Sequence, residues 1–317
     1  MASYLFAVFT LLFYIPFFSA AQEKAILLAD PTIFYDQGTY YLYGTGAPDG
    51  FPVYTSTDLY TWKGPNGASQ GYALHKRDAF GTSGFWAPQV FKYQGIYYMI
   101  YTANEHLAIA QSNSPLGPFK QEKKEALAGD TKQIDPFVFF DQNKAYLYFV
   151  RLQEGNRIYV AELTKDLKQI KEESIKPCLN AREAWENTAH SEWPVSEGPT
   201  VLKHKGYYYL LYSANDFRNP DYAVGYATSR SPLGPWKKHA GNPIISKEKL
   251  GINGTGHGDL FQDRAGQLYY VLHSHYNDHQ VSPRKTVRVK LGFRPTAEGL
   301  DELYLQDQHP EELMQSP

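Results

Sequence analysis

DPTIFYDQGTYYLYG, residues 30–44, carries the pattern that decides the fold. Aromatic and β-branched residues flank Gly38, a residue type that tolerates the positive φ of a tight turn, so the segment predicts a β-hairpin. Self-similarity at a fixed spacing indicates repeated structural units. Four later segments align with the first one without gaps, and they are APQVFKYQGIYYMIY (87–101), DPFVFFDQNKAYLYF (135–149), GPTVLKHKGYYYLLY (198–212) and GDLFQDRAGQLYYVL (258–272).

A second hairpin half follows most of these segments. Each one predicts a short strand, a polar turn and a further strand that begins at Trp62, Phe119 or Trp236. The stretches are FPVYTSTDLYTWK (51–63), LAIAQSNSPLGPFK (107–120) and YAVGYATSRSPLGPWK (222–237). Each unit therefore holds about four antiparallel strands, and five units fill the chain. We expect an all-β, five-bladed β-propeller rather than an open sandwich with coincidental hairpins.

The composition agrees with a globular β protein. The chain has 317 residues, of which 43% are apolar and 20% charged. Its net charge of −2 does not indicate binding to nucleic acid. Its 26 tyrosines suit half-buried sheet surfaces and polar ligands such as sugars. The single cysteine, Cys178, excludes an intrachain disulfide.

The first 21 residues have the character of a secretory signal peptide. The apolar run YLFAVFTLLFYIPFF (4–18) is followed by Ser19-Ala20-Ala21, which predicts cleavage after Ala21. A membrane anchor is the weaker interpretation, because the run is short of about 20 residues and contains Pro16. We therefore expect residues 22–317 to form one catalytic domain with a short C-terminal tail. We expect this domain to be a periplasmic or secreted monomer, with no membrane contact after cleavage.

The residues that enter the first strand of each unit should converge on the propeller axis. Three of them are acidic and come from three different units: Asp30, Asp135 and Glu197. Trp86 and His257 stand at comparable places in two other units. Two carboxyl groups across a sugar can hydrolyse a glycosidic bond, and a third one nearby raises the pKa of the acid. A calcium cage also uses several carboxylates, but usually from one loop.

These motifs resemble glycoside hydrolase family 43 over about residues 25–295. The resemblance rests on Ala29-Asp30-Pro31, Trp86-Ala87-Pro88, Ile134-Asp135-Pro136, Ser196-Glu197-Gly198-Pro199 and Gly254-Thr255-Gly256-His257-Gly258. It implies a five-bladed propeller that hydrolyses arabinose-, xylose- or galactose-containing glycans with inversion. It does not explain how Glu197, one residue earlier in the repeat than Asp30, reaches the axis. A local bend or bulge must place it there.

The resemblance also implies roles for single residues. Asp30 corresponds to the general base, Glu197 to the general acid and Asp135 to the residue that tunes the acid. Trp86 corresponds to a wall of the sugar pocket, and His257 to an axial histidine that orders water or lies beside a calcium ion. A substrate-binding arginine is expected late in the last blade, where Arg284 is preferred over Arg288 because it directly follows the turn Ser282-Pro283.

Other functions remain open at this stage. A non-catalytic carbohydrate-binding propeller would not need an acid–base pair. An endo-acting arabinanase would share the residues but differ in the shape of its cleft. A retaining fructan hydrolase would begin with an Asn-Asp-Pro-Asn-Gly type motif, which this chain lacks. The histidines of HSHYNDH (273–279) are interpreted as loop and pocket-rim residues and not as a zinc site. No cofactor is expected to be required, although calcium bound through water near His257 is a possibility, and the expected partner is an oligo- or polysaccharide.

Overall fold

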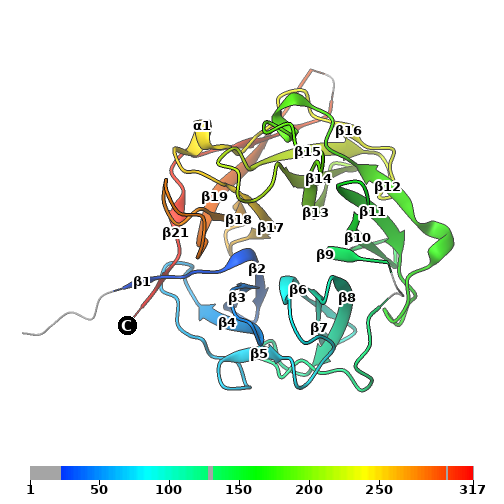
Figure 1. The fold of residues 1–317 in the computed structure, drawn as a ribbon, viewed down its shortest axis with the longest axis vertical. Helices are drawn as coiled ribbons and strands as arrows, with labels where there is room; N and C mark the ends of the chain where they lie inside the picture. Colours follow the sequence, from blue (N-terminus) through cyan, green and yellow to red (C-terminus); the bar gives the residue numbers. More distant parts are fainter. Residues whose placement is uncertain (1–22, 128–130, 298, 317) are drawn as a thin grey trace, which may run out of the picture.

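The computed structural model describes residues 23–127, 131–297 and 299–316. Five antiparallel sheets surround a central axis, and the inner strands β2, β6, β9, β13 and β17 face it (Figure 1). This arrangement confirms the five-bladed propeller. The expected signal peptide lies outside the described residues. Among the residues that are described, no helix has the length and apolar character needed to cross a bilayer.

The blades follow one another along the chain, and each is a continuous segment. Blade 1 contains β2 (Ala29–Asp36), β3 (Thr39–Thr45), β4 (Gly50–Ser56) and β5 (Tyr72–His75), and blade 2 contains β6 (Trp86–Tyr93), β7 (Ile96–Ala103) and β8 (His106–Ser112). Blade 3 contains β9 (Gln133–Asp141), β10 (Lys144–Leu152), β11 (Asn156–Glu162) and β12 (Lys176–Leu179), and blade 4 contains β13 (Ser196–His204), β14 (Tyr207–Ala214), β15 (Ala223–Ser229) and β16 (Lys237–Lys238). Blade 5 contains β17 (Gly256–Gln262), β18 (Leu268–Ser274), β19 (Lys285–Arg294), β20 (Glu302–Leu305) and β21 (Glu311–Glu312).

The outer strands depart from the predicted pattern. In blade 1 the fourth strand is β5, whereas the segment at Trp62 forms only bridges. In blade 2 the strand expected from Phe119 is reduced to a single bridge between Gln111 and Lys120. Only three short helices accompany the strands of the described chain, and they are η1 (Glu172–Ser174), η2 (Ala184–Glu186) and α1 (Lys247–Leu250).

The inner hairpins show why the repeat predicts the fold. In blade 1 the two turn residues Gln37 and Gly38 have φ values of 47° and 86°, the signs that a type I′ turn requires. The fifth hairpin is different, because residues 263–267 separate β17 from β18. The fifth segment is therefore not an ungapped repeat. The strand registers place Asp259 opposite Val271, the position that Thr32 occupies opposite Tyr43 in blade 1, so the predicted alignment is wrong by one residue there.

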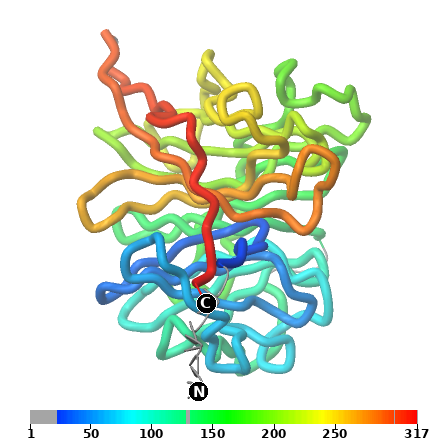
Figure 2. Tube along the Cα trace, turned by 90° about the vertical axis from the view of Figure 1, so that its left-hand side faces the viewer, coloured from blue at the N-terminus to red at the C-terminus, as the bar shows by residue number. Residues whose placement is uncertain are grey.

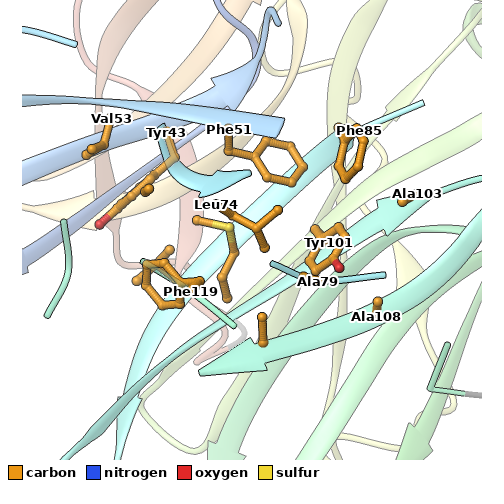
Figure 3. Close-up of a cluster of buried hydrophobic side chains, with 14 of the residues drawn as sticks. Tyr43, Phe51, Val53, Leu74, Ala79, Phe85, Tyr101, Ala103, Ala108 and Phe119 are labelled. Carbon is orange, nitrogen blue, oxygen red and sulfur yellow. The ribbon is translucent and has the colours of Figure 1, made fainter. Parts of the chain in front are cut away.

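Apolar clusters fill the spaces between blades. In the cluster shared by blades 1 and 2, the Phe51 ring meets Phe85 and Tyr101 edge-on, with centroids 5.9 and 5.5 Å apart (Figure 3). Buried tyrosines also bind the two identical SPLGP turns. The hydroxyl of Tyr43 donates to the Pro115 carbonyl at 2.5 Å, and that of Tyr148 to the Pro232 carbonyl at 2.6 Å. Tyrosine thus provides both apolar packing and a polar link between neighbouring blades.

The C-terminal residues join the last blade to the start of the chain. Strand β21 pairs with β19 of blade 5, and β22 (Met314–Gln315) then pairs with β1 (Lys24–Ala25), which precedes blade 1. The Ile26 amide adds a hydrogen bond to the Leu313 carbonyl at 2.9 Å. Figure 2 shows this red segment descending from the orange last blade toward the blue first blade. The expected short tail therefore closes the ring.

Candidate active site

A β-bulge at the start of each inner strand builds the site. Every first strand shows a register shift there, and the bulged residue has a positive φ between 44° and 57°. A bulge adds one residue to one strand and redirects the side chains around it. The bulged residues are Asp30, Ala87, Asp135, Gly198 and His257. His257 is therefore the structural counterpart of Asp30 and Asp135, not of Glu197 as the ungapped alignment implied.

The bulge also explains how Glu197 belongs to the site. Glu197 directly precedes the bulged Gly198, and Trp86 holds the same place before Ala87. A cavity of about 20 Å³ is lined by residues of all five inner strands, with Asp30, Asp135 and His257 in its wall. That volume holds about one water molecule.

Asp30 lies among cationic and polar groups. Its carboxylate is 3.1 Å from Nη1 of Arg284 and 3.3 Å from Nδ1 of His273, and it accepts a hydrogen bond of 2.7 Å from the Thr45 hydroxyl. Burial raises the pKa of Asp30, but Arg284, His257 and His273 outweigh it and hold this pKa well below its usual value. Asp30 is therefore ionised at neutral pH and can accept a proton.

Glu197 has the opposite electrostatic environment. Its carboxyl accepts hydrogen bonds from the Tyr222 hydroxyl and the Asn156 amide, both at 2.7 Å. Burial has the largest effect and raises the pKa of Glu197. The two hydrogen bonds lower this pKa, and the negative charge of Asp30 raises it. Together these effects give a pKa of about 7. Glu197 can therefore hold a proton near neutral pH and donate it.

Asp135 is close enough to both of these carboxyl groups for their charges to affect it. Its Oδ2 accepts a hydrogen bond from the Gly198 amide at 3.2 Å and lies 3.8 Å from Nδ1 of His257. Burial, Glu197 and Asp30 together raise the pKa of Asp135 well above its usual value. The three carboxyl groups therefore form one coupled set in which only Asp30 has a cation as its direct partner.

The remaining predicted residues occupy different places. Trp86 begins β6 with 38% of its surface exposed, as a pocket wall would be. Arg284 reaches Asp30 and stacks over Phe217, whereas the buried Arg288 pairs with Glu311 away from the axis. His257 is buried, with its Nδ1 3.5 Å from Asp30.

The interpretation of the histidines of residues 273–279 as loop and pocket-rim residues is wrong for His273, and the three do not share one contact. His273 is fully buried in β18 and contacts Asp30, and burial is the main reason that its pKa falls to about 3. His275 instead contacts the Phe217 carbonyl, and His279 is exposed. Among the described residues, no group of three His, Cys, Asp or Glu side chains is arranged to hold a metal ion. A calcium ion bound through water near His257 stays a prediction.

Several contributors to the site were not found from the sequence. His273, Tyr222 and Asn156 all bind one of the acidic residues, yet none of them lies in an inner strand. His273 lies in a continuous run of buried residues in β18, and the other two stand at the ends of loops. No sequence signal separates these positions from ordinary core residues.

One hydrogen bond recurs between neighbouring blades. The amide of the bulged residue donates to a side chain at the end of the second strand in the preceding blade. Four junctions have this bond, namely Ala87 to Thr45 (2.9 Å), Asp135 to Thr102 (3.0 Å), His257 to Ser213 (2.7 Å) and Asp30 to His273 (3.2 Å). At the fifth junction the corresponding residue is Val150, which has no acceptor, and the Gly198 amide binds Asp135 instead. The valine thus leaves this amide free to orient Asp135.

Val150→Thr is expected to lower kcat/KM about fivefold without unfolding the protein. The new hydroxyl supplies the acceptor found at the other junctions, so the Gly198 amide turns away from Asp135, and a hydrogen bond is worth about 1 kcal/mol. Steady-state kinetics measures the effect. Val160→Thr, in the same apolar cluster, is the control and should change only the melting temperature. Unchanged kinetics in Val150→Thr would contradict this account of Asp135.

An ionised carboxylate and a protonated carboxyl group near one axis are what acid–base hydrolysis of a glycosidic bond requires. The chain belongs to glycosyl hydrolases family 43, whose model matches residues 24–295. It is similar to the solved structure of an endo-1,4-beta-xylanase from Bacteroides thetaiotaomicron VPI-5482, with 38% identity, a TM-score of 0.84 and coverage of 93% of this chain and 99% of that one.

Two other relatives have lower sequence identity. A xylosidase/arabinosidase of Butyrivibrio fibrisolvens is 30% identical over 204 residues, which is 60% of this chain and 37% of that protein. A beta-D-galactofuranosidase of Aspergillus niger is 26% identical over 286 residues, 80% of this chain and 77% of that protein. The matched region thus spans little more than a third of the Butyrivibrio protein. The names of these relatives cover different sugars, while the glycosidase class is common to them.

Proposed function

We propose that the protein releases terminal xylosyl or arabinofuranosyl residues from plant-type glycans by a single inverting displacement. The observation that carries the proposal is the contrast between two buried carboxyl groups. Asp30 lies 3.1 Å from Nη1 of Arg284, which favours its ionised form, whereas Glu197 binds the neutral Tyr222 and Asn156 side chains and has a raised pKa. In this assignment Asp30 removes a proton from water while Glu197 protonates the leaving oxygen.

Burial of the reacting groups supports action on chain ends. Asp30, Asp135, Glu197 and His257 are all between 5% and 9% exposed. A polysaccharide that runs across an open cleft would need more accessible carboxyl groups, whereas a single terminal sugar can enter a recess. The names of the relatives support pentose or galactofuranose substrates.

The test is a panel of aryl glycosides with β-D-xylopyranosyl, α-L-arabinofuranosyl and β-D-galactofuranosyl groups, together with xylan and arabinan. We expect turnover of one aryl pentoside and release of monosaccharide from the polymer. Proton NMR of the first product should show the inverted anomer. A retained anomer would reject the mechanism, oligosaccharide products would favour an endo-acting enzyme, and binding without turnover would favour a carbohydrate-binding propeller.

The pH dependence of kcat/KM should be a broad bell with its basic limb near pH 7. Glu197 must be protonated, so activity falls as the pH rises through its pKa of about 7. Asp30 must be ionised, and its pKa lies well below the usual value, so the acidic limb should lie below about pH 4. Initial rates between pH 3 and 9 measure both limbs. A basic limb above pH 9 would contradict the role of Glu197.

A further inference from the structure

A chain of hydrogen bonds links the molecular surface to Glu197. Trp193 has 47% of its surface exposed, and its indole N–H donates to Oδ1 of Asn156 at 2.9 Å. Asn156 is buried, and its Nδ2 donates to Oε2 of Glu197 at 2.7 Å. One buried amide therefore separates an exposed aromatic ring from the carboxyl group proposed as the acid.

The indole determines which way the Asn156 amide faces. An indole nitrogen is a donor only, so the side of Asn156 that meets it must be the carbonyl oxygen. The NH₂ group then has to face Glu197, where it donates to the carboxylate. The opposite orientation would present a carbonyl oxygen, which can accept only from the protonated carboxyl group. By fixing this orientation, Trp193 makes Asn156 stabilise the ionised form of Glu197.

The backbone holds these residues in place. The Asn156 amide donates to the Pro194 carbonyl at 2.9 Å, and Asn156 forms a parallel bridge with Val195. Gly155 permits this close approach, because a Cβ at that position would lie 2.4 Å from the Pro194 carbonyl oxygen. Trp193 lies in the loop between β12 and β13. At the other end of this loop, the fully buried Glu186 binds Lys238. The loop is therefore anchored on both sides of Trp193.

The position of Trp193 fits the leaving-group half of a substrate. If Glu197 protonates the glycosidic oxygen, the group that departs must lie beside Glu197. An exposed indole there offers a flat apolar face to the next sugar ring. Contacts with this remote sugar can then contribute to the rate, and not only to binding.

We propose that Trp193 is a binding and positioning residue for the leaving-group side, where its exposed face packs against the departing sugar and its N–H fixes Asn156 on Glu197. The proposal rests on the proposed role of Glu197 as the acid. It assigns two tasks to Trp193, namely packing against the departing sugar and fixing Asn156. Two substitutions separate these tasks. Trp193→Phe keeps an aromatic face but removes the N–H, whereas Trp193→Ala removes both.

The first experiment needs no substrate. The side-chain carboxyl carbons of Glu are labelled with ¹³C, and the signal of Glu197 is assigned by its loss in Glu197→Gln and followed against pH. In Trp193→Phe the freed amide can turn its oxygen toward the protonated acid, so the midpoint should rise by about one pH unit. Trp185→Phe is the matched control, because its indole donates to Glu183 in the same loop. An unchanged midpoint in Trp193→Phe, or an equal shift in Trp185→Phe, would overturn the link.

The second experiment measures kinetics with xylobiose or α-1,5-arabinobiose, whichever is cleaved, and with the matching glycosyl fluoride, which has no leaving-group sugar. Trp193→Ala should lower kcat/KM for the disaccharide about tenfold and leave the fluoride nearly unchanged. Trp193→Phe should retain most disaccharide binding but move the basic limb upward with the NMR midpoint. Equal losses on both substrates would overturn the binding task. If the midpoint moves but the basic limb does not, the link holds and Glu197 is not the acid.

Discussion

Asp30→Asn is expected to lower kcat/KM by about 10²–10⁴-fold, which is the usual contribution of a positioned base. The amide cannot accept a proton from water, yet it can still accept the hydrogen bond that Thr45 donates to the carboxylate. The loss should be similar for aryl glycosides with good and poor leaving groups, because water must be activated in the same displacement step whichever group departs. Steady-state kinetics over such a series measures it.

The control is Asp141→Asn. Asp141 is also an inner-strand carboxylate and binds Lys203 and the Tyr208 hydroxyl, but it stands at the other end of β9. This variant should lose stability without losing activity. If Asp30→Asn keeps more than a tenth of the activity, or if Asp141→Asn falls as far, Asp30 is not the base.

Glu197→Gln should cause a loss of similar size that depends on the leaving group. Proton donation matters most when the departing oxygen is basic, so a disaccharide should lose about 10²–10⁴-fold and a dinitrophenyl glycoside far less. The basic limb near pH 7 should also disappear, because glutamine does not titrate. Circular dichroism and the melting temperature show whether the fold is kept. Equal losses across all leaving groups would reject the assignment of Glu197.

The parts of the site predicted from sequence are those encoded in the inner strands. The blade number and the approach of Asp30, Asp135 and Glu197 to one axis follow from local hairpin patterns, which the structure preserves. The alignment was wrong in blade 5 because residues 263–267 lengthen one hairpin, and an ungapped comparison cannot detect such an insertion.

The rest of the site depends on contacts between distant segments. Asn156 starts the third strand of its blade and Tyr222 precedes the third strand of the next, and both reach Glu197 only through packing. His273 is as deeply buried as a residue of the apolar core. Only its contact with Asp30 of the first blade distinguishes it from such a residue. The bulges likewise follow from the pairing of two strands rather than from a single residue type. Their Asp, Ala, Gly and His residues share no side-chain property.

The junction between the first and last blades links activity to the completion of folding. Asp30 is separated from His273 by 243 residues and from Arg284 by 254, and these partners reach it only when the last blade has packed against the first. Contacts between such distant residues form late, because the intervening chain must first be ordered. A refolding sample should therefore regain the signal of its sheets before it regains turnover. The rate at which activity returns would then report the rate of the last folding step.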